Sequence, residues 1–536
     1  MHDRSRQLEE LAERLFDVVV IGGGITGAGI ARDAAMRGLS VGLIDKGDFA
    51  GGTSSRSSRL VHGGVRYLEH GHLHLVFEAS AERRLLLKLA PHLVRPLAFT
   101  WPVYQGQRLP LWKLASGLML YDILSLFRNV GRYKRLARKD VLAHEPRVRA
   151  DDLRGGVRYW DAATDDARLT LANALDARAL GAIVVNHVQF LRAAPAEDGV
   201  RVIGTRDQLG GRELEVRARV LVNATGPWSD SVRMLEAEEG GAGVGAGPTA
   251  RIQGSKGAHI AVRRDRVGNR DALTLLHPDD GRVLFALPAG AHTVVGTTDT
   301  FTDASPDDVR ASRSDLDYLL GAANRFFPDA RLAADDVVAA WAGIRPLMPS
   351  RGSSVAASRE HAIGREERRT VTITGGKLTT YRVMAREVVD AVQELLGRRR
   401  VRATTNVRPL PGGELDVVLA VQEAMRATND AAHATRLVHA YGSAWRDVEA
   451  YCTRDDAARR AVVAELPYRM GEMRWCVERE MACTIGDLLI RRTRVAFETK
   501  DNGRAAARAV AQHLAMPASE VERYEAEAAR IFTVDP

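Results

Sequence analysis

The sequence predicts an α/β fold with an inserted sheet domain and a helical C-terminal domain. Three features lead to this prediction: a strand, glycine turn, helix and strand pattern over 16–45, short alternating strands over 250–299, and a helical pattern rich in alanine, arginine and glutamate after 416. A chain of 536 residues is long enough for two or three domains with separate cores.

The N-terminal pattern is typical of a dinucleotide-binding unit. "FDVVVI" (16–21) indicates a buried parallel strand, "GGGITGAGIARDAAMRG" (22–38) a helix ended by glycine, and "LSVGLID" (39–45) a second strand. Its GxGxxG turn allows a tight bend, close approach of a pyrophosphate to the helix N-terminus, and close packing of helix on strand. Asp45 follows at the position where a carboxylate binds a ribose hydroxyl.

Two later segments favour FAD over NAD as the dinucleotide. "RVLVNATGPWSD" (219–230) is a buried strand that leads into Ala-Thr-Gly, and "TVTITGGKLTTYR" (370–382) is a strand, a glycine pair and a helix. The second helix would direct its N-terminus toward an electron-rich flavin ring. Three such units in one chain make FAD the better prediction.

Charge and composition limit the partners. The formal net charge of +8 indicates either arginines spread over a solvated surface or an anionic partner, which could be a phosphate substrate, acidic lipid or nucleic acid. There is no aromatic–basic ribonucleoprotein motif and no zinc-finger spacing, which argues against nucleic acid. The three cysteines form no CxxC pair, so we expect neither a disulfide framework nor a zinc site.

The location is predicted from what the sequence lacks. The N-terminal stretch "MHDRSRQLEELAERLF" has no apolar core of a signal peptide, and no uncharged apolar run approaches the roughly 18 residues of a membrane span. We therefore expect a cytoplasmic protein. We also expect no metal site, because "HGHLH" (70–74) is more typical of the start of a solvent-facing helix.

Seven segments together resemble the FAD-dependent glycerol-3-phosphate dehydrogenases, and the resemblance covers nearly the whole chain. They are "VVVIGGGITGAGIARDAAMRGLSV", "TSSRSSRLVHGGVRYLEHG", "WDAATDDARLTLANA", "NATGPW", "VVGTTDT", "WAGIRPL" and "GGKLTTYR". The resemblance implies a flavoprotein of the glutathione-reductase and amino-acid-oxidase type. Such an enzyme oxidises sn-glycerol 3-phosphate to dihydroxyacetone phosphate and passes the electrons to membrane quinone.

This class implies a discontinuous architecture. We expect an FAD-binding domain over about 14–95, 150–230 and 335–400, within 1–400. An antiparallel-sheet substrate domain would be inserted over about 96–149 and 231–334, with "PAGAH" as a hairpin turn and the glycine-rich 237–248 as a loop. The segments "YGSAWRDVEAY" and "EREMACTIGDLLIRRTRVAFE" in 401–536 look like the C-terminal cap domain of the bacterial family.

The segment "GDFAGGTSSRSSRLVHGG" (47–64) would cross from the adenosine end of FAD toward its ring. Its hydroxyls would satisfy pyrophosphate and ribitol oxygens, and its glycines would let the backbone pass under the ring. The full set of predicted cofactor-binding residues is Gly22, Gly24, Ile25, Thr26, Gly27, Asp45, Thr53, Ser54, Ser55, Ser58, Gly63, Gly64, Val188, Ala224, Thr225, Gly226, Gly376, Lys377, Leu378 and Thr379.

Alcohol oxidation by hydride transfer leaves a hydroxyl proton to be removed, and histidine suits that task near neutral pH. His62 is the favoured proton acceptor and His259 the second choice; Arg345 and Lys377 complete the predicted catalytic set. The substrate phosphate needs fixed positive charge, which arginine supplies best. The predicted substrate-binding residues are Arg66, Tyr67, Lys256, Arg345 and Arg359, with Lys377 beside them.

An enzyme that reduces quinone without a spanning helix must dock on the membrane, here the inner face of the cell membrane. The best candidate is 109–140, an apolar stretch followed by a basic cluster suited to anionic lipid; the alternative is a core helix followed by a solvated basic turn. The helix after Lys377 and the C-terminal domain are rival surfaces. The oligomeric state stays open, a homodimer included.

The sequence leaves two other functions open. One is an oxidase that uses dioxygen as acceptor and forms hydrogen peroxide. The other is a non-catalytic FAD-fold binding protein, which the presence of Lys377, Arg345 and His62 disfavours.

Overall fold

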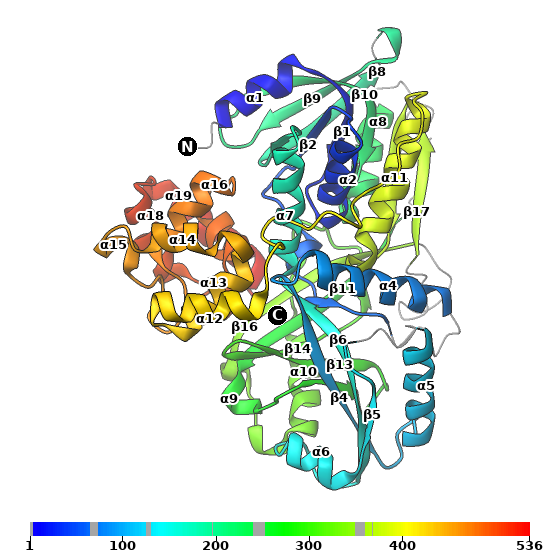
Figure 1. Ribbon diagram of the computed structural model, residues 1–536, viewed down its shortest axis with the longest axis vertical. Helices are drawn as coiled ribbons and strands as arrows, with labels where there is room; N and C mark the ends of the chain where they lie inside the picture. Colours follow the sequence, from blue (N-terminus) through cyan, green and yellow to red (C-terminus); the bar gives the residue numbers. More distant parts are fainter. Residues whose placement is uncertain are drawn as a thin grey trace.

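The computed structural model describes residues 4–64, 73–124, 130–195, 197–238, 252–348, 360–366 and 368–536. Two sheets lie one above the other in Figure 1, and a cluster of C-terminal helices packs beside the junction between them. Most of the glycine-rich stretch 237–248 falls outside the described residues. The α/β fold with a helical C-terminal domain is confirmed.

The first sheet begins with the unit expected from the sequence. β1 (Leu15–Ile21) runs into α2 (Ile25–Met36) and β2 (Val41–Ile44), which pairs parallel with β1. Gly38 takes the left-handed conformation just after the helix, as expected for a stop. Among the described residues the sheet has eight strands, in the order β17 (His361–Glu366), β18 (Thr370–Gly375), β10 (Glu213–Asn223), β1, β2 and β7 (Ile183–Val185), with β8 (Val188–Pro195) and β9 (Arg201–Asp207) extending from β10.

Helices cover this sheet and close its core. α2 packs between α7 (Asp166–Ala179) and α11 (Tyr381–Leu395), and the three helices bury small and β-branched side chains against the central strands. α1 (Arg4–Glu13) and α8 (Ser229–Glu238) lie near the outer strands β7 and β8. Because β1, β10 and β18 run parallel, their carboxyl ends meet at one edge of the sheet, and this edge faces the second sheet.

The second sheet is antiparallel except where β12 and β4 run parallel. The turn "PAGAH" is a hairpin, confirmed by the pairing of Ala289 with His292 and by the positive φ of Gly290. Within the described residues ten strands form the sheet: β15 (Thr300–Phe301), β11 (Gln253–Arg263), β14 (His292–Gly296), β13 (Val283–Ala289), β12 (Ala272–Leu276), β4 (Val94–Tyr104), β6 (Leu153–Thr164) and β3 (Leu60–Val61) in order, with β16 (Val337–Leu347) on β11 and β5 (Lys134–Leu136) on β6.

This sheet contains strands from ranges that the sequence motifs placed in the FAD-binding domain. β6 lies within 150–230 and β16 within 335–400, yet both pair along their length with strands of the second sheet. Each strand precedes a segment of the first domain: β6 leads directly into α7, and β17 and β18 are the next strands described after β16. A boundary placed at the sequence motifs could not detect that these strands belong to the second sheet.

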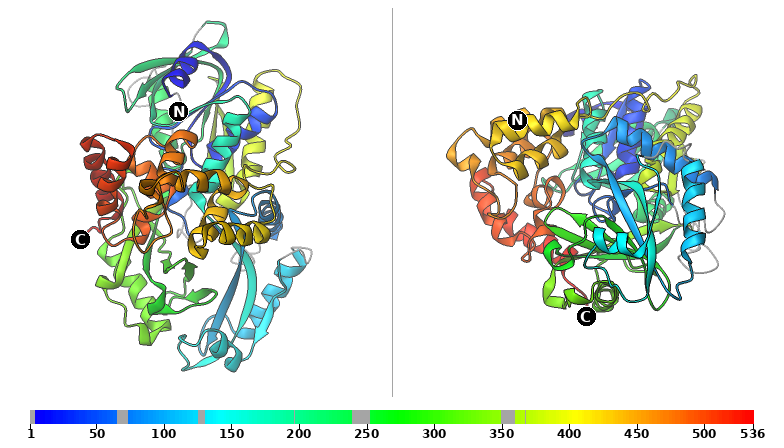
Figure 2. Two further views of the ribbon diagram at one scale, coloured as in Figure 1. Left: turned by 60° about the vertical axis from the view of Figure 1, so that its left-hand side comes forward. Right: turned by 60° about the horizontal axis from the view of Figure 1, so that its bottom comes forward.

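Helices flank the second sheet and build the C-terminal domain. α10 (Arg313–Phe326) and the short α6 (Arg138–His144) and α9 (Arg264–Val267) lie at its far end, while α4 (Leu73–Leu89) and α5 (Leu111–Leu124) pack together along one side (Figure 1). The C-terminal domain consists of α12 (Val417–Thr428), α13 (Ala431–Tyr441), α14 (Trp445–Cys452), α15 (Asp456–Arg459), α16 (Met470–Arg479), a π-helical turn at Asp487–Arg492, α17 (Val495–Glu498), α18 (Arg504–Leu514) and α19 (Ala518–Phe532). Figure 2 shows these helices along one side of the molecule, where α17 and α19 contact β16 of the second sheet and the π-helical turn contacts α7.

The helix α5 has two apolar faces. Leu114, Leu118 and Tyr121 are buried against the sheet, while Trp112 and Met119 are 69% and 52% exposed. Among the described helices, none combines the length and the apolar character needed to cross a bilayer.

Candidate active site

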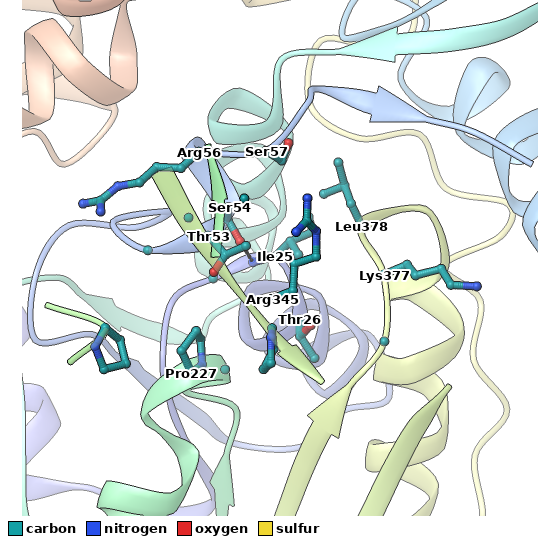
Figure 3. Close-up of a pocket in the computed structure, with 18 of the residues that line it drawn as sticks. Ile25, Thr26, Thr53, Ser54, Arg56, Ser57, Pro227, Arg345, Lys377 and Leu378 are labelled. Carbon is teal, nitrogen blue, oxygen red and sulfur yellow. Dashed lines mark hydrogen bonds between the residues drawn. The ribbon is translucent and has the colours of Figure 1, made fainter. Parts of the chain in front are cut away.

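A cavity of about 930 Å³ runs between the two sheets. Its walls are the loops at the carboxyl ends of β1, β2, β10 and β18, the face of the second sheet, and helix α19 of the C-terminal domain. Figure 3 shows lining residues from several of these parts, among them Thr53, Pro227 and Lys377. A cleft at the carboxyl ends of parallel strands is where open α/β sheets bind ligands.

The glycine turn at the end of β1 is shaped by close backbone contacts. Gly22 has φ of +101°, and a Cβ there would lie 2.7 Å from the carbonyl oxygen of Ala224. A Cβ on Gly27 would lie 1.8 Å from the carbonyl oxygen of Gly22, so this glycine sets the contact of helix with strand. Gly24 precedes the helix, and its own Cβ position borders Ser54 and the cavity. Gly22 and Gly27 thus take the turn and packing positions expected of such a motif, and Gly24 leaves its side of the turn open to the cavity.

Asp45 sits at the end of β2, beside this turn. Its carboxylate accepts hydrogen bonds from the backbone N–H groups of Gly23 (2.6 Å) and Gly47 (2.8 Å) while it lines the cavity. Burial raises the pKa of Asp45, and the two N–H donors oppose that shift. The arrangement fixes an acceptor at the place where a ribose hydroxyl would enter.

The segment after β2 lines the cavity, and its hydroxyl groups make hydrogen bonds to residues of different elements. The hydroxyl of Thr53 donates to the carbonyl of Ile344 at 2.6 Å, and Ser54 Oγ accepts the N–H of Ile25 at 3.0 Å. Ser58 Oγ lies 2.9 Å from Nε2 of His259. The segment therefore joins the glycine turn to the second sheet.

The two candidate histidines line the same cavity but differ in environment. His62 is half-buried, and its backbone N–H donates to Oγ1 of Thr379 at 3.2 Å. His259 is buried, and its ring stacks on Trp341 with centroids 5.5 Å apart. Burial, followed by the charges of Arg345 and Arg59, lowers the pKa of His259 to about 3, so this imidazole is neutral at physiological pH.

Positive charge enters the cavity from β16 and from the loop after β18. Arg345 donates to Oγ1 of Thr297 at 2.9 Å and lies 3.4 Å from the Asp299 carboxylate, which orients the guanidinium. Lys377 lines the cavity beside Gly376 and Leu378, and its side chain points away from Arg345 in Figure 3. The site thus combines a dinucleotide turn, cationic groups and two histidines in one space.

Two family models match the chain. Residues 17–391 match the model described as FAD dependent oxidoreductase, and residues 403–519 match the C-terminal domain of alpha-glycerophosphate oxidase. The chain is 36% identical over 515 residues to glycerol-3-phosphate dehydrogenase 2 of Mycobacterium tuberculosis, covering 95% of this chain and 86% of that protein. It is 34% identical over 508 residues to the aerobic glycerol-3-phosphate dehydrogenase of Bacillus subtilis, covering 92% and 89%.

The chain belongs to the FAD-dependent glycerol-3-phosphate dehydrogenase family. A solved structure of the glycerol-3-phosphate dehydrogenase from Bacillus halodurans, complexed with FAD, superposes with a TM-score of 0.79 at 31% identity and covers 98% of this chain and 97% of its own. FAD is the cofactor of this family member. The cavity fits that cofactor, because Gly22 and Gly24 line it without side chains at the helix N-terminus and because Asp45 is fixed beside them.

Most of the predicted cofactor residues of this dehydrogenase line the cavity, and four do not. Gly27 packs against the turn, Ser55 Oγ bonds within its own turn to the carbonyl of Gly52, and the N–H of Gly63 donates to Asp161 at 3.0 Å. Val188 is buried, and its backbone N–H donates a hydrogen bond to the carbonyl of Asp45. The residues that line the cavity are Gly22, Gly24, Ile25, Thr26, Asp45, Thr53, Ser54, Ser58, Gly64, Ala224, Thr225, Gly226, Gly376, Lys377, Leu378 and Thr379.

The predicted phosphate set is only partly placed in the cavity. Arg345 lines it, whereas Lys256 points to the other side of β11 and pairs with Asp315 at 2.6 Å. Side chains alternate across a strand, so Gly257 and His259 face the cavity and Lys256 does not. Arg66, Tyr67 and Arg359 lie outside the described residues.

Several lining residues were missed from the sequence. Phe99, Trp101 and Tyr159 form an aromatic floor on β4 and β6, and Asp161 belongs to the segment "WDAATDDARL" that the family motif includes. Arg491, Glu527 and Arg530 reach the cavity from the C-terminal domain. The motif position was a usable signal for Asp161, but no local signal in the sequence pointed to the C-terminal residues.

Proposed function

We propose that this dehydrogenase oxidises sn-glycerol 3-phosphate to dihydroxyacetone phosphate and passes the electrons to membrane quinone. The observation that supports the proposal is the single cavity that contains the FAD turn, Arg345, Lys377 and both histidines. Bound FAD supplies the hydride acceptor. The names of the relatives support the same substrate.

The protein's own residues have separate roles in this proposal. Arg345 binds the substrate phosphate, since its guanidinium lines the cavity and is oriented by Thr297 and Asp299. Lys377 adds a second positive charge to the same cavity, with its side chain directed away from Arg345. His62 takes the hydroxyl proton as the carbonyl forms. Neutral His259, whose ring is hydrogen-bonded to the hydroxyl of Ser58, is the alternative proton acceptor.

Anaerobic mixing with glycerol 3-phosphate tests the substrate. Bleaching of the flavin absorbance would support the proposal, and an unchanged spectrum with a fully FAD-loaded protein would contradict it. Addition of a soluble quinone or of dioxygen to the reduced protein then identifies the acceptor. Fast reoxidation by oxygen with release of hydrogen peroxide would favour the oxidase.

The exposed apolar face of α4 and α5 supports docking on the inner face of the cell membrane. Leu73 and Phe77 of α4 are 44% and 50% exposed, next to the apolar face of α5. The exposed apolar residues of α5 are Trp112, Met119, Leu120 and Ile123. Exposed bases follow at Arg132, Lys134, Arg135, Arg138 and Lys139. Apolar residues that enter the headgroup boundary beside a basic cluster are typical of peripheral membrane binding.

A further inference from the structure

Three arginines in four residues of the C-terminal domain are buried in contact with the FAD-binding domain. Arg491, Arg492 and Arg494 are 4%, 2% and 6% exposed, and they lie at the end of the π-helical turn and just after it. Burial of a guanidinium is costly unless carboxylates pair with it. A π-helical turn is rare and often marks a functional position.

Arg491 and Arg492 both bind Asp48. Nε of Arg491 lies 2.8 Å from the Asp48 carboxylate, and Arg492 adds two contacts of 2.6 Å and 3.0 Å. The side-chain amide of Asn186 donates to the same carboxylate at 2.8 Å. Asp48 follows Asp45 by three residues and lines the same cavity. The pairing of Arg491 and Arg492 with Asp48 is the first of two contacts between the C-terminal domain and the segment 45–58, and we call it the first arm.

Arg494 contacts the far end of the segment 45–58 through Asp166. Its Nη2 lies 2.6 Å from Oδ1 of Asp166 and 2.6 Å from Asp165. The second oxygen of Asp166 accepts hydrogen bonds from the backbone N–H (3.2 Å) and hydroxyl (2.7 Å) of Ser57. Ser57 lines the cavity between Arg56 and Ser58. This is the second arm.

We propose that these three residues, the arginine clamp, position the segment 45–58 and thereby set the affinity of the protein for FAD. The clamp holds the segment at both ends, and between those ends lie Thr53 and Ser54. The C-terminal domain is then a part of the cofactor site. The inference depends on FAD binding along this segment and not on the substrate or the electron acceptor.

Electrostatics gives a reason for two arginines on one carboxylate. Asp45 and Asp48 are close enough for the charge of Asp48 to disfavour the ionised form of Asp45. Arg491 and Arg492 neutralise Asp48, which relieves that repulsion at the ribose-binding acid. Arg492 and Arg494 do not line the cavity, so they are positioning residues that act through Asp48 and Ser57.

The test measures FAD release from the holoenzyme. Arg492→Gln and Arg494→Gln are compared with the wild type by dilution of the holoenzyme and by titration of the apoprotein with FAD, both followed by flavin fluorescence. We expect the dissociation constant for FAD to rise about 2- to 30-fold in each variant, the range for residues that influence a site without contacting its ligand. Arg492→Lys, which retains the charge, should recover part of the affinity.

Arg436→Gln is the matched control. Arg436 forms a buried bidentate pair with Glu472, at 2.7 Å and 2.6 Å, entirely within the C-terminal domain. Its loss should lower the melting temperature without changing the FAD affinity. An unchanged dissociation constant in both clamp variants, or an equal rise in the Arg436 variant, would overturn the proposal.

A variant on the FAD-binding side covers the case in which the clamp variants do not fold. Ser57→Ala removes the shorter hydroxyl contact of the second arm, keeps the backbone N–H contact and leaves every arginine paired. It should weaken FAD binding, although less than Arg494→Gln. FAD binding of wild-type strength in a folded Ser57→Ala protein would contradict the second arm.

Discussion

Ser58 Oγ and His259 Nε2 lie 2.9 Å apart, and this contact ties the cofactor-binding segment to the antiparallel sheet. The contact occupies one ring nitrogen of His259, while burial keeps the ring neutral. His62 is the less buried of the two histidines. These environments make separable predictions for the two side chains.

His62→Ala is expected to slow flavin reduction at saturating glycerol 3-phosphate by about 10²- to 10⁴-fold, because the proton acceptor is lost. Stopped-flow absorbance of the FAD-loaded protein measures this rate. His259→Ala is the matched variant, and we expect a smaller effect from it. The reverse order would move the proton-accepting role to His259.

Arg345→Ala is expected to weaken substrate binding by about 1.5–3 kcal/mol for a lost charge-assisted hydrogen bond. The substrate concentration at half-maximal flavin reduction should rise accordingly, with a smaller change in the limiting rate. Lys256→Ala is the informative comparison, since Lys256 pairs with Asp315 on the opposite face of the strand. A larger effect from Lys256 than from Arg345 would contradict the placement of the phosphate.

Gly24→Val is expected to abolish FAD binding, because the branched side chain would enter the cavity where the pyrophosphate approaches the helix. The purified variant should be colourless. Gly321→Ala serves as the control, since a Cβ at this helical position meets no atom within 4 Å. A yellow Gly24→Val protein with normal FAD content would refute the proposed cradle.

The sequence predicted the parts of the site that depend on local order. The β1–α2 turn was readable because its glycines, helix and following strand are consecutive, and the two later flavin segments were readable for the same reason. Lys256 pairs with Asp315 on the face of β11 opposite His259, and the alternation of a strand separates these two side chains. Ser55 turns its hydroxyl to the carbonyl of Gly52, and a run of serines does not show which hydroxyls face the cavity.

The remaining features depend on contacts between distant segments. Arg491 meets Asp48 across 443 positions of the chain, and no periodicity or spacing indicates such a pair. The second sheet likewise takes β6 and β16 from segments that carry motifs of the first domain. Only the folded chain brings these groups together.

Acid should destabilise the protein through buried neutral histidines such as His92. Burial, followed by the charge of Arg168, lowers the pKa of His92 to about 3. A depressed pKa gives a stability contribution that is complete above the unfolded value of about 6.5 and is lost as the pH falls, by at most about 1.4 kcal/mol per pH unit. His92→Gln should therefore flatten the loss of melting temperature between pH 6.5 and 4, and an unchanged slope would exclude this residue as a source of acid sensitivity.

Membrane docking predicts two separable contributions from α5 and the bases that follow it. A variant with Arg132, Lys134, Arg135 and Arg138 changed to Glu should lose binding to acidic liposomes in a sedimentation assay, since each base near the surface contributes about 1 kcal/mol. High salt should weaken liposome binding by the wild type in the same way.

Trp112→Ser with Ile123→Ser should weaken liposome binding at both low and high salt, because these exposed side chains contribute apolar area rather than charge. Val418→Ser with Leu419→Ser, an exposed apolar pair on α12 of the C-terminal domain, is the control. Wild-type binding by both α5-region variants, with loss in the α12 control, would assign the docking surface to the C-terminal domain instead.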